Sequence, residues 1–253
     1  MKTADLDRYF RSILPIEDFA KSDVSLNGLQ LGSSGDEVQK IAFAVDACMA
    51  SFEQAAALKA DMIFVHHGLY WGKPVPVTGV MYERLRFLLT NRISLYAAHL
   101  PLDMHPEIGN NAGIAAALEL KDVQPFGTYR GSKIGYKGKL SEPCSIEEIK
   151  NTVVSGDSGT ELVLPFGDEK ISTVAIVSGG AASDVEEAIE EEIDCYITGE
   201  PSHQVYHTCL EAGINVIFGG HYKTETWGVK LLSEKCKNET GVETVFLDIP
   251  TGL

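Results

Sequence analysis

Two adjacent histidines, His66 and His67, follow the apolar residues 63–65 and precede Gly68. A short β-branched, apolar run that stops at polar residues and a glycine predicts a buried strand that ends at an open site. Successive side chains of a strand point to opposite faces, so the two imidazoles could serve two centres, or one centre and its support. Imidazole is a common metal ligand, and metal binding is therefore the chemistry considered first.

Three later segments place similar polar side chains directly after a predicted strand: His99 to Asp103, Thr198 to Glu200, and His221 to Glu225. Ligands of α/β sheets bind at the carboxyl ends of strands, so these side chains are expected at one site. If the last helix begins near His221, then His221 and Glu225 share one helical face. Asp103 follows Pro101, and we expect it on a loop.

Five of these side chains are the predicted metal ligands: His66, His67, Asp103, His221 and Glu225. An open zinc site needs only three protein ligands, so five favour two ions. Metal-bound histidine is neutral, and two divalent ions against two carboxylates leave a surplus of about two positive charges, which would attract anions. A water between two such ions becomes a nucleophile near neutral pH, so hydrolysis is the predicted chemistry.

His99 and Glu200 are the candidate catalytic residues. His99 mirrors His221 at the end of the equivalent strand, and the alternative is that it only orients the ligands. Glu200 is interpreted as a general base or a support for a ligand, and the alternative is an ordinary residue at a helix N-terminus. His105 and His207 are interpreted as ordinary core or surface residues.

Alternating strands and helices must position these side chains. Strands are predicted at residues 41–45, 62–65, 93–97, 133–140, 161–164, 173–177, 195–197, 214–218 and 242–247. Helices are predicted at residues 3–14, 51–59, 82–90, 110–120, 146–153, 183–191 and 205–211, with a final helix that ends near residue 236. Strand–helix–strand order with short connections predicts parallel strands and right-handed crossovers, whereas residues 125–171 read as antiparallel strands and turns. The turn-rich residues 27–30 are expected against the site or a neighbouring subunit.

The second half repeats the landmarks of the first. His99-x-x-x-Asp103 and His221-x-x-x-Glu225 occupy the ends of equivalent strands, and residues 65–68 correspond to residues 197–200. This equal spacing predicts a duplicated α/β unit. The N-terminal half, residues 1–125, carries His66, His67 and Asp103, and the C-terminal half, residues 126–253, carries His221 and Glu225.

Composition limits the possible partners and compartment. The chain has 253 residues, with 36 acidic and 21 basic side chains and a net charge of −15, which disfavours nucleic acid as a partner. Five cysteines without a CxxC pair suggest neither a disulfide framework nor a zinc ribbon. The N-terminus lacks an apolar signal region and no run has membrane-spanning length, so we expect a soluble cytoplasmic protein without membrane contact.

The motifs HHG, HLPLD, SGGAA, ITGE and GHYKTE together resemble the dinuclear-metal-centre hexameric family, also called Nif-like, whose members are named GTP cyclohydrolase type-2 homologues. The resemblance covers nearly the whole chain. It implies two similar, interlinked α/β halves, mixed sheets flanked by helices, and a toroidal homohexamer built as a trimer of dimers. It also implies one ion at His66, His221 and Glu225 and a second at His67, Asp103 and Glu225. The connection between the halves is too short for the extra domain of longer relatives.

The leading hypothesis is a hydrolase that uses two divalent ions per subunit to act on a nucleotide-like or phosphorylated small molecule; GTP cyclohydrolase chemistry is implied by the resemblance alone. The alternative is a non-catalytic metal-binding scaffold, metal-trafficking factor or regulator. Histidine and carboxylate ligands suit zinc, iron, manganese and nickel, and metal availability often decides among them, so the sequence does not name the metal.

Overall fold

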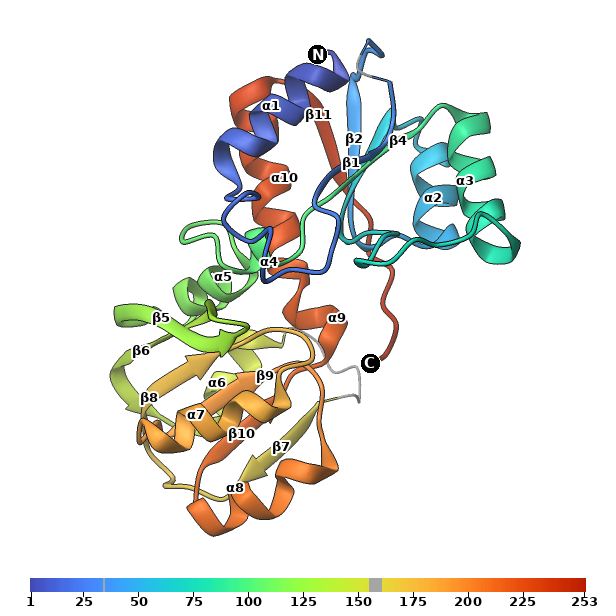
Figure 1. The fold of residues 1–253 in the computed structure, drawn as a ribbon. Coiled ribbons are helices and arrows are strands. Elements are labelled where there is room, and N and C mark those ends of the chain that lie inside the picture. Colours follow the sequence, from blue (N-terminus) through green and yellow to red (C-terminus); the bar gives the residue numbers. More distant parts are fainter. Residues whose placement is uncertain (34, 155–160) are drawn as a thin grey trace. The chain divides into compact units, whose positions relative to one another are not determined.

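The computed structural model describes residues 1–33, 35–154 and 161–253 (Figure 1). The chain divides into two compact units. The first unit comprises residues 1–105 and 229–249, and the second unit comprises residues 106–228 and 250–253. The chain thus returns to the first unit after forming the second, so the two α/β parts are interlinked. The closing strand, predicted as part of the C-terminal half, belongs to the first unit.

A five-stranded sheet with the order β1-β4-β3-β2-β11 forms the centre of the first unit. Its strands are β1 (Gly28–Leu31), β2 (Lys40–Asp46), β3 (Met62–His67), β4 (Ser94–Ala97) and β11 (Glu243–Phe246). Strands β2, β3, β4 and β11 are parallel, and β1 pairs antiparallel with β4. The central strands are near-continuous apolar runs, as expected where helices cover both faces of a parallel sheet.

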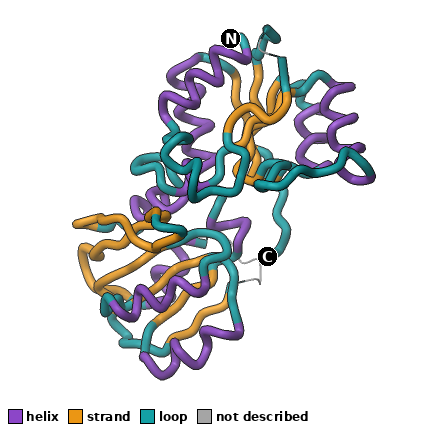
Figure 2. Tube along the Cα trace, viewed as in Figure 1, coloured by secondary structure: helices purple, strands orange, loops and turns teal. Residues whose placement is uncertain are grey.

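Helices pack on both faces of this sheet (Figures 1 and 2). On one face lie α1 (Thr3–Ile13) and α10 (Thr226–Thr240), and on the other lie α2 (Met49–Ala57) and α3 (Gly79–Asn91). The alternation along β3 matches these layers. Val65 packs in one cluster with Phe52 and Leu88, whereas the ring of Phe64 lies 5.0 Å from that of Phe10.

The second unit contains a six-stranded sheet with the order β5-β6-β8-β9-β10-β7. Its strands are β5 (Lys121–Tyr129), β6 (Ser132–Cys144), β7 (Leu162–Pro165), β8 (Ile171–Ile176), β9 (Cys195–Thr198) and β10 (Asn215–Phe218). Strands β8, β9 and β10 are parallel, and the other pairs are antiparallel, so the sheet is mixed.

Helices also flank the second sheet. Ile114 of α5 (Asn110–Ala117) and Ile149 of α6 (Ile146–Val153) pack in one apolar cluster with Val174, Ile197 and Ile217 of the strands. The remaining helical segments are the 3-10 turns η1 (Ala182–Asp184) and η2 (His203–Val205), α7 (Val185–Glu190), α8 (Tyr206–Ala212) and α9 (His221–Thr224). No helix in the described part of the chain has both the length and the apolar character needed to cross a membrane.

Both units contain the predicted repeat. In each, three successive strands lie parallel and side by side in chain order, β2-β3-β4 in the first unit and β8-β9-β10 in the second. A helix follows the first strand of each trio, and the polar segments of the sequence follow the later strands. The predicted α/β fold with mixed sheets flanked by helices is therefore confirmed.

Three local predictions differ from the structure. Asp103 does not lie on a loop: it ends the short helix α4 (Leu100–Asp103), since Pro101 falls in the first turn, where a missing N–H costs no hydrogen bond. Residues 27–30, expected to form turns, lie mostly in the edge strand β1. The strand β5 was not predicted because its first five residues are exposed and show no apolar alternation.

Candidate metal centre

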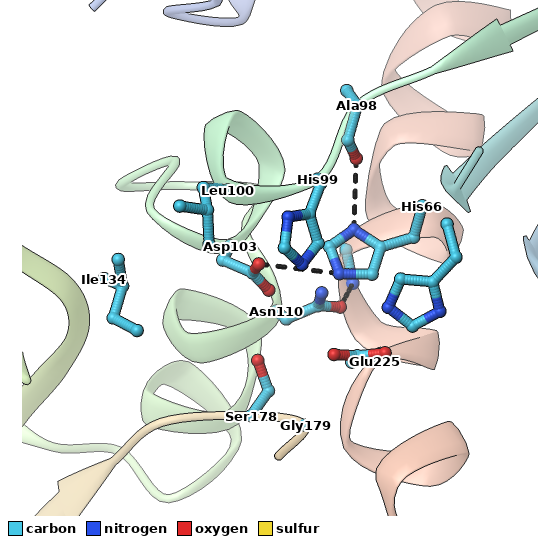
Figure 3. Close-up of polar contacts among 12 residues, drawn as sticks. His66, Ala98, His99, Leu100, Asp103, Asn110, Ile134, Ser178, Gly179 and Glu225 are labelled. Atoms are coloured by element: carbon cyan, nitrogen blue, oxygen red, sulfur yellow. Dashed lines mark hydrogen bonds and ion pairs between the residues drawn. The ribbon is translucent and has the colours of Figure 1, made fainter. Parts of the chain in front are cut away.

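His66 lies at the carboxyl end of β3, and its side chain is fully buried. Its Nδ1 lies 3.0 Å from the carbonyl oxygen of Ala98, and its Nε2 lies 3.5 Å from Oδ2 of Asp103 (Figure 3). A carbonyl oxygen only accepts hydrogen bonds, so Nδ1 is the donor and neutral His66 carries its lone pair on Nε2. The two atoms that could bind a metal ion, Nε2 of His66 and Oδ2 of Asp103, therefore face each other.

His67 is oriented by the neighbouring strand. Its Nδ1 lies 2.8 Å from Oδ1 of Asp46, which sits opposite His67 in the β2–β3 register. An ionised carboxylate accepts a hydrogen bond from Nδ1–H, which leaves Nε2 as the basic nitrogen. The rings of His66 and His67 are only 4.7 Å apart although the residues alternate along the strand. The two imidazoles thus meet at the strand end instead of serving distant centres.

His99 follows β4 and is held by a buried network. Its Nδ1 lies 3.0 Å from Oδ1 of Asp23, and its backbone N–H donates to the side-chain oxygen of Asn27 at 2.8 Å. The second oxygen of Asp23 accepts from the backbone N–H of Leu100 at 3.0 Å and from the amide of Asn27 at 2.9 Å. Burial alone would raise the pKa of Asp23, but the hydrogen bond and charge of His99, together with hydrogen bonds from Asn27 and Ser25, outweigh it and lower the pKa.

These three histidines form a cluster in the first unit. One ring nitrogen of each lies within 4.8 Å of the others, a grouping that can hold a metal ion. The ring of His99 lies 5.1 Å from His66 and 5.7 Å from His67. Trp71 covers the cluster: its ring meets the edge of His99 at 5.1 Å, and its indole N–H donates to the carbonyl of Gly68 at 3.0 Å. Trp71 remains 38% exposed, so it forms the solvent side of the cluster.

The second unit carries its own ligand pair. His221 begins α9 directly after the turn that follows β10, and Glu225 caps the end of the same helix. Nε2 of His221 lies 3.1 Å from Oε2 of Glu225, whose side chain is only 4% exposed. The predicted common face of His221 and Glu225 is confirmed. Nδ1 of His221 lies 2.6 Å from Oε1 of Glu200, which places Glu200 behind the ring as a support.

Glycines leave room around this pair. The carbonyl of Gly179 accepts from the N–H groups of Gly199 and Glu200 at 2.9 and 3.0 Å, which joins two loops at the strand ends. Gly179 has a φ of +71°, and a methyl group there would lie 2.3 Å from Oε1 of Glu225 and 3.3 Å from Nε2 of His221. The space that a side chain would fill is therefore the space beside both ligand atoms. Gly179 thus borders both candidate ligands of the second unit.

The donor chemistry of both units fits divalent metal ions. Nδ1 of each candidate histidine is hydrogen-bonded to an oxygen of its own unit, and such a partner almost always accompanies a metal-bound histidine. Two ligand atoms on one zinc ion lie about 3.3 Å apart in a tetrahedral arrangement. The nitrogen–oxygen separations of 3.5 Å at His66–Asp103 and 3.1 Å at His221–Glu225 are close to that value.

The structure divides the predicted ligands between the units. His66, His67 and Asp103 belong to the first unit, together with His99, whereas His221 and Glu225 belong to the second. That the two sets bind one pair of ions together stays a prediction.

Two residues beside the histidines were missed by the sequence analysis. Asp46 could have been found, because it ends the predicted strand next to that of His67 and parallel strands end at one edge of a sheet. Asp23 lies in a segment without periodic pattern and carried no signal. Of residues 27–30, expected against the site or a neighbouring subunit, Asn27 contacts His99.

Comparisons with known proteins agree with this architecture. The sequence model of Duf34/NIF3 (NGG1p interacting factor 3) matches residues 1–252. A protein of Archaeoglobus fulgidus named GTP cyclohydrolase 1 type 2 homolog is 46% identical over 253 residues, with 100% of both chains covered. A protein of the same name from Treponema pallidum is 43% identical over 286 residues, also with 100% of both chains covered.

Solved structures share the whole fold. TTHA1606 from Thermus thermophilus superposes with a TM-score of 0.90 and 39% identity, and the match covers 100% of both chains. Reduced HcgD from Methanocaldococcus jannaschii superposes with a TM-score of 0.85 and 27% identity over 98% of both chains. With sequence and fold matched over nearly their full length, the chain belongs to the Duf34/NIF3 family.

Proposed function

We propose that the chain is a metal-dependent hydrolase that binds two divalent ions per subunit and acts on a nucleotide-like or phosphorylated small molecule. The observation that carries the proposal is the orientation of the four histidines. Each has Nδ1 bonded to an oxygen, so each neutral ring keeps a basic Nε2, and those of His66 and His221 lie beside the carboxylates of Asp103 and Glu225. The names of the curated relatives point to GTP as the first substrate to test.

The proposed ligands are the five predicted from the sequence. His66, His221 and Glu225 would hold one ion, and His67, Asp103 and Glu225 the other, as the family resemblance implies. When bound, such a pair of ions polarises the bond to be hydrolysed and activates water. Zinc, iron, manganese and nickel ions are all compatible with this donor set.

Glu200 and His99 are proposed to assist the reaction. One oxygen of Glu200 holds Nδ1 of His221, and half of its side chain is exposed, so the second oxygen can accept a proton from solvent or substrate. His99 lies beside both histidines of β3 and can orient them or take part in binding. Trp71, at the exposed side of the cluster, offers a flat surface for a planar group.

The assembly and compartment follow the resemblance as well. We propose a toroidal homohexamer, a trimer of dimers, in the cytoplasm, with neither nucleic acid nor membrane as a partner. Light scattering coupled to size exclusion should give six times the 27.5 kDa mass of the chain. A monomer at micromolar concentration would contradict this assembly.

The activity is tested with protein freed of metal and reloaded separately with each of the four metals. GTP, other nucleotides and simple phosphoesters form the substrate panel, and turnover is expected with at least one metal. Asp103→Asn and Glu225→Gln should each lower turnover by at least about 100-fold, since each removes a charged ligand. His207→Ala, an exposed histidine of the second unit, serves as the control. Stoichiometric metal without turnover across the panel, or unchanged turnover in both variants, would reject the hydrolase.

A further inference from the structure

The three histidines of the first unit lead to an inference about how metal enters the site. We propose that the first unit binds one divalent ion by itself, through His66, His67 and His99, before the residues of the second unit take part. The proposal rests on the metal binding proposed above and assigns His99 as a ligand. It is independent of whether the loaded protein hydrolyses anything.

The geometry of the cluster supports a single ion. One ring nitrogen of each histidine lies within 4.8 Å of the other two. Nitrogens bound to the same zinc ion lie about 3.3 Å apart in a tetrahedral site and about 4 Å apart when opposite each other. Closing the cluster onto an ion therefore needs side-chain shifts of about 1 Å, which rotations of three neighbouring rings can supply. Three histidine ligands with one open position form a well-known type of zinc site.

The tautomers of the three rings are set by the first unit alone. The carbonyl of Ala98, the carboxylate of Asp46 and the carboxylate of Asp23 each accept a hydrogen bond from one Nδ1. Each partner belongs to residues 1–105, so no group of the second unit is needed to leave the three Nε2 atoms basic. A set of ligands that is already oriented loses little freedom when an ion binds.

His99 is held more firmly than an ordinary loop histidine. Asp23 is almost completely buried and uses both oxygens to fix the ring and the backbone around His99. Asn27 adds a bond to the backbone N–H of His99 and a second bond to Asp23. Burial of a carboxylate costs folding free energy unless it is hydrogen-bonded in this way. A role in orienting His99 as a metal ligand would explain why Asp23 is buried at this position.

The proposal predicts an order of filling. The first ion binds the cluster of the first unit. When the second ion binds, His66 and His67 divide between the two ions as proposed above, and this step requires Glu225 and His221. A variant that lacks the two ligands of the second unit should therefore keep one ion per chain, whereas an ordinary two-ion site without its shared carboxylate would lose both. Asp103, 3.5 Å from Nε2 of His66, supplies a neighbouring oxygen in the same unit.

The test uses the full chain with the double substitution His221→Ala/Glu225→Ala and cobalt(II) as the probe. Calorimetry should give one ion per chain, and visible absorption should show cobalt bound by nitrogen ligands. Adding His99→Ala should weaken cobalt binding by at least about 100-fold and change the absorption spectrum, whereas adding His207→Ala should change neither. His99→Gln provides a second replacement, and thermal melting verifies that each variant is folded.

The outcomes separate this inference from the proposed function. The double variant is expected to be inactive in any case, so only its metal content bears on the inference. No bound cobalt in the folded double variant, or equal affinity with and without His99, would overturn it. Failure of the wild-type protein to hydrolyse any substrate would reject the proposed activity and leave the one-ion site intact.

Discussion

Substitution of Gly179 by alanine tests the site in the second unit directly. A methyl group at this position would lie 2.3 Å from Oε1 of Glu225, whereas ordinary contact begins at 3.4 Å. The carboxylate, which is the end of a side chain, would have to move by about 1.1 Å, the difference between these two distances. Metal–ligand distances tolerate only about 0.2 Å, so the displaced oxygen would no longer bind the ion. We expect a 10- to 100-fold loss of metal affinity, which corresponds to about 1.4–2.8 kcal/mol.

Gly131→Ala provides a matched control in the same unit. Gly131 has a φ of +83°, close to the +71° of Gly179, but a methyl group there would meet nothing within 4 Å. Both substitutions place a side chain in the left-handed region and should cost about 1–2 kcal/mol of stability. Only Gly179→Ala should weaken binding of zinc or cobalt when titrated by calorimetry. Equal metal affinity in the two variants would refute the placement of Glu225 as a ligand beside this glycine.

Three further predictions concern the partner of His67, a partly buried carboxylate of the second unit, and the effect of metal on stability. Asp46→Asn should weaken metal binding by about 10- to 100-fold without loss of fold, because it alters the partner of Nδ1 in His67; unchanged affinity by calorimetry would contradict that role. Burial, and then the charge of Glu187, raise the pKa of Asp184 to about 6, so the folded state loses stability as the pH rises from about 4 to about 6. The Asp184→Asn variant should therefore melt about 2–4 °C higher than wild type near pH 8, with no difference near pH 3.5. This shift in melting temperature corresponds to about 1 kcal/mol after allowance for the partial exposure of Asp184. An equal gain at both pH values would exclude the charge of Asp184 as the cause. Divalent metal at 100 times its dissociation constant should stabilise the wild type by about 2.7 kcal/mol in thermal melting, and a gain that survives removal of all the candidate ligands would point to another site.

The strands and the positions of the histidines at their ends could be predicted because the relevant signals are local. An apolar run such as residues 62–65 must be buried, and polar residues directly after it must lie at the carboxyl edge of a parallel sheet. His66 and His221 were found by this reasoning alone, and the two parallel trios follow from the alternation of strands and helices.

The features that could not be predicted depend on contacts between residues that are distant in the sequence. Asp23 and His99 are 76 positions apart in the sequence. Asp23 is buried only because the chain folds back onto it, and no periodic pattern predicts such burial. The edge strands β1 and β5 have few buried side chains, so apolar alternation could not reveal them. The chain returns to the first unit because β11 pairs with β2. The apolar residues 242–247 predict a strand but do not indicate which strand it pairs with.

The central claim is that ligands of both units bind one pair of ions. Crystals grown with zinc and without chelator, measured at energies on both sides of the zinc absorption edge, test it most directly. We predict two anomalous peaks per chain, with His66, His67 and Asp103 contributed by the first unit and His221 and Glu225 by the second. Peaks located away from these five residues, or no ordered zinc at full occupancy, would contradict the claim.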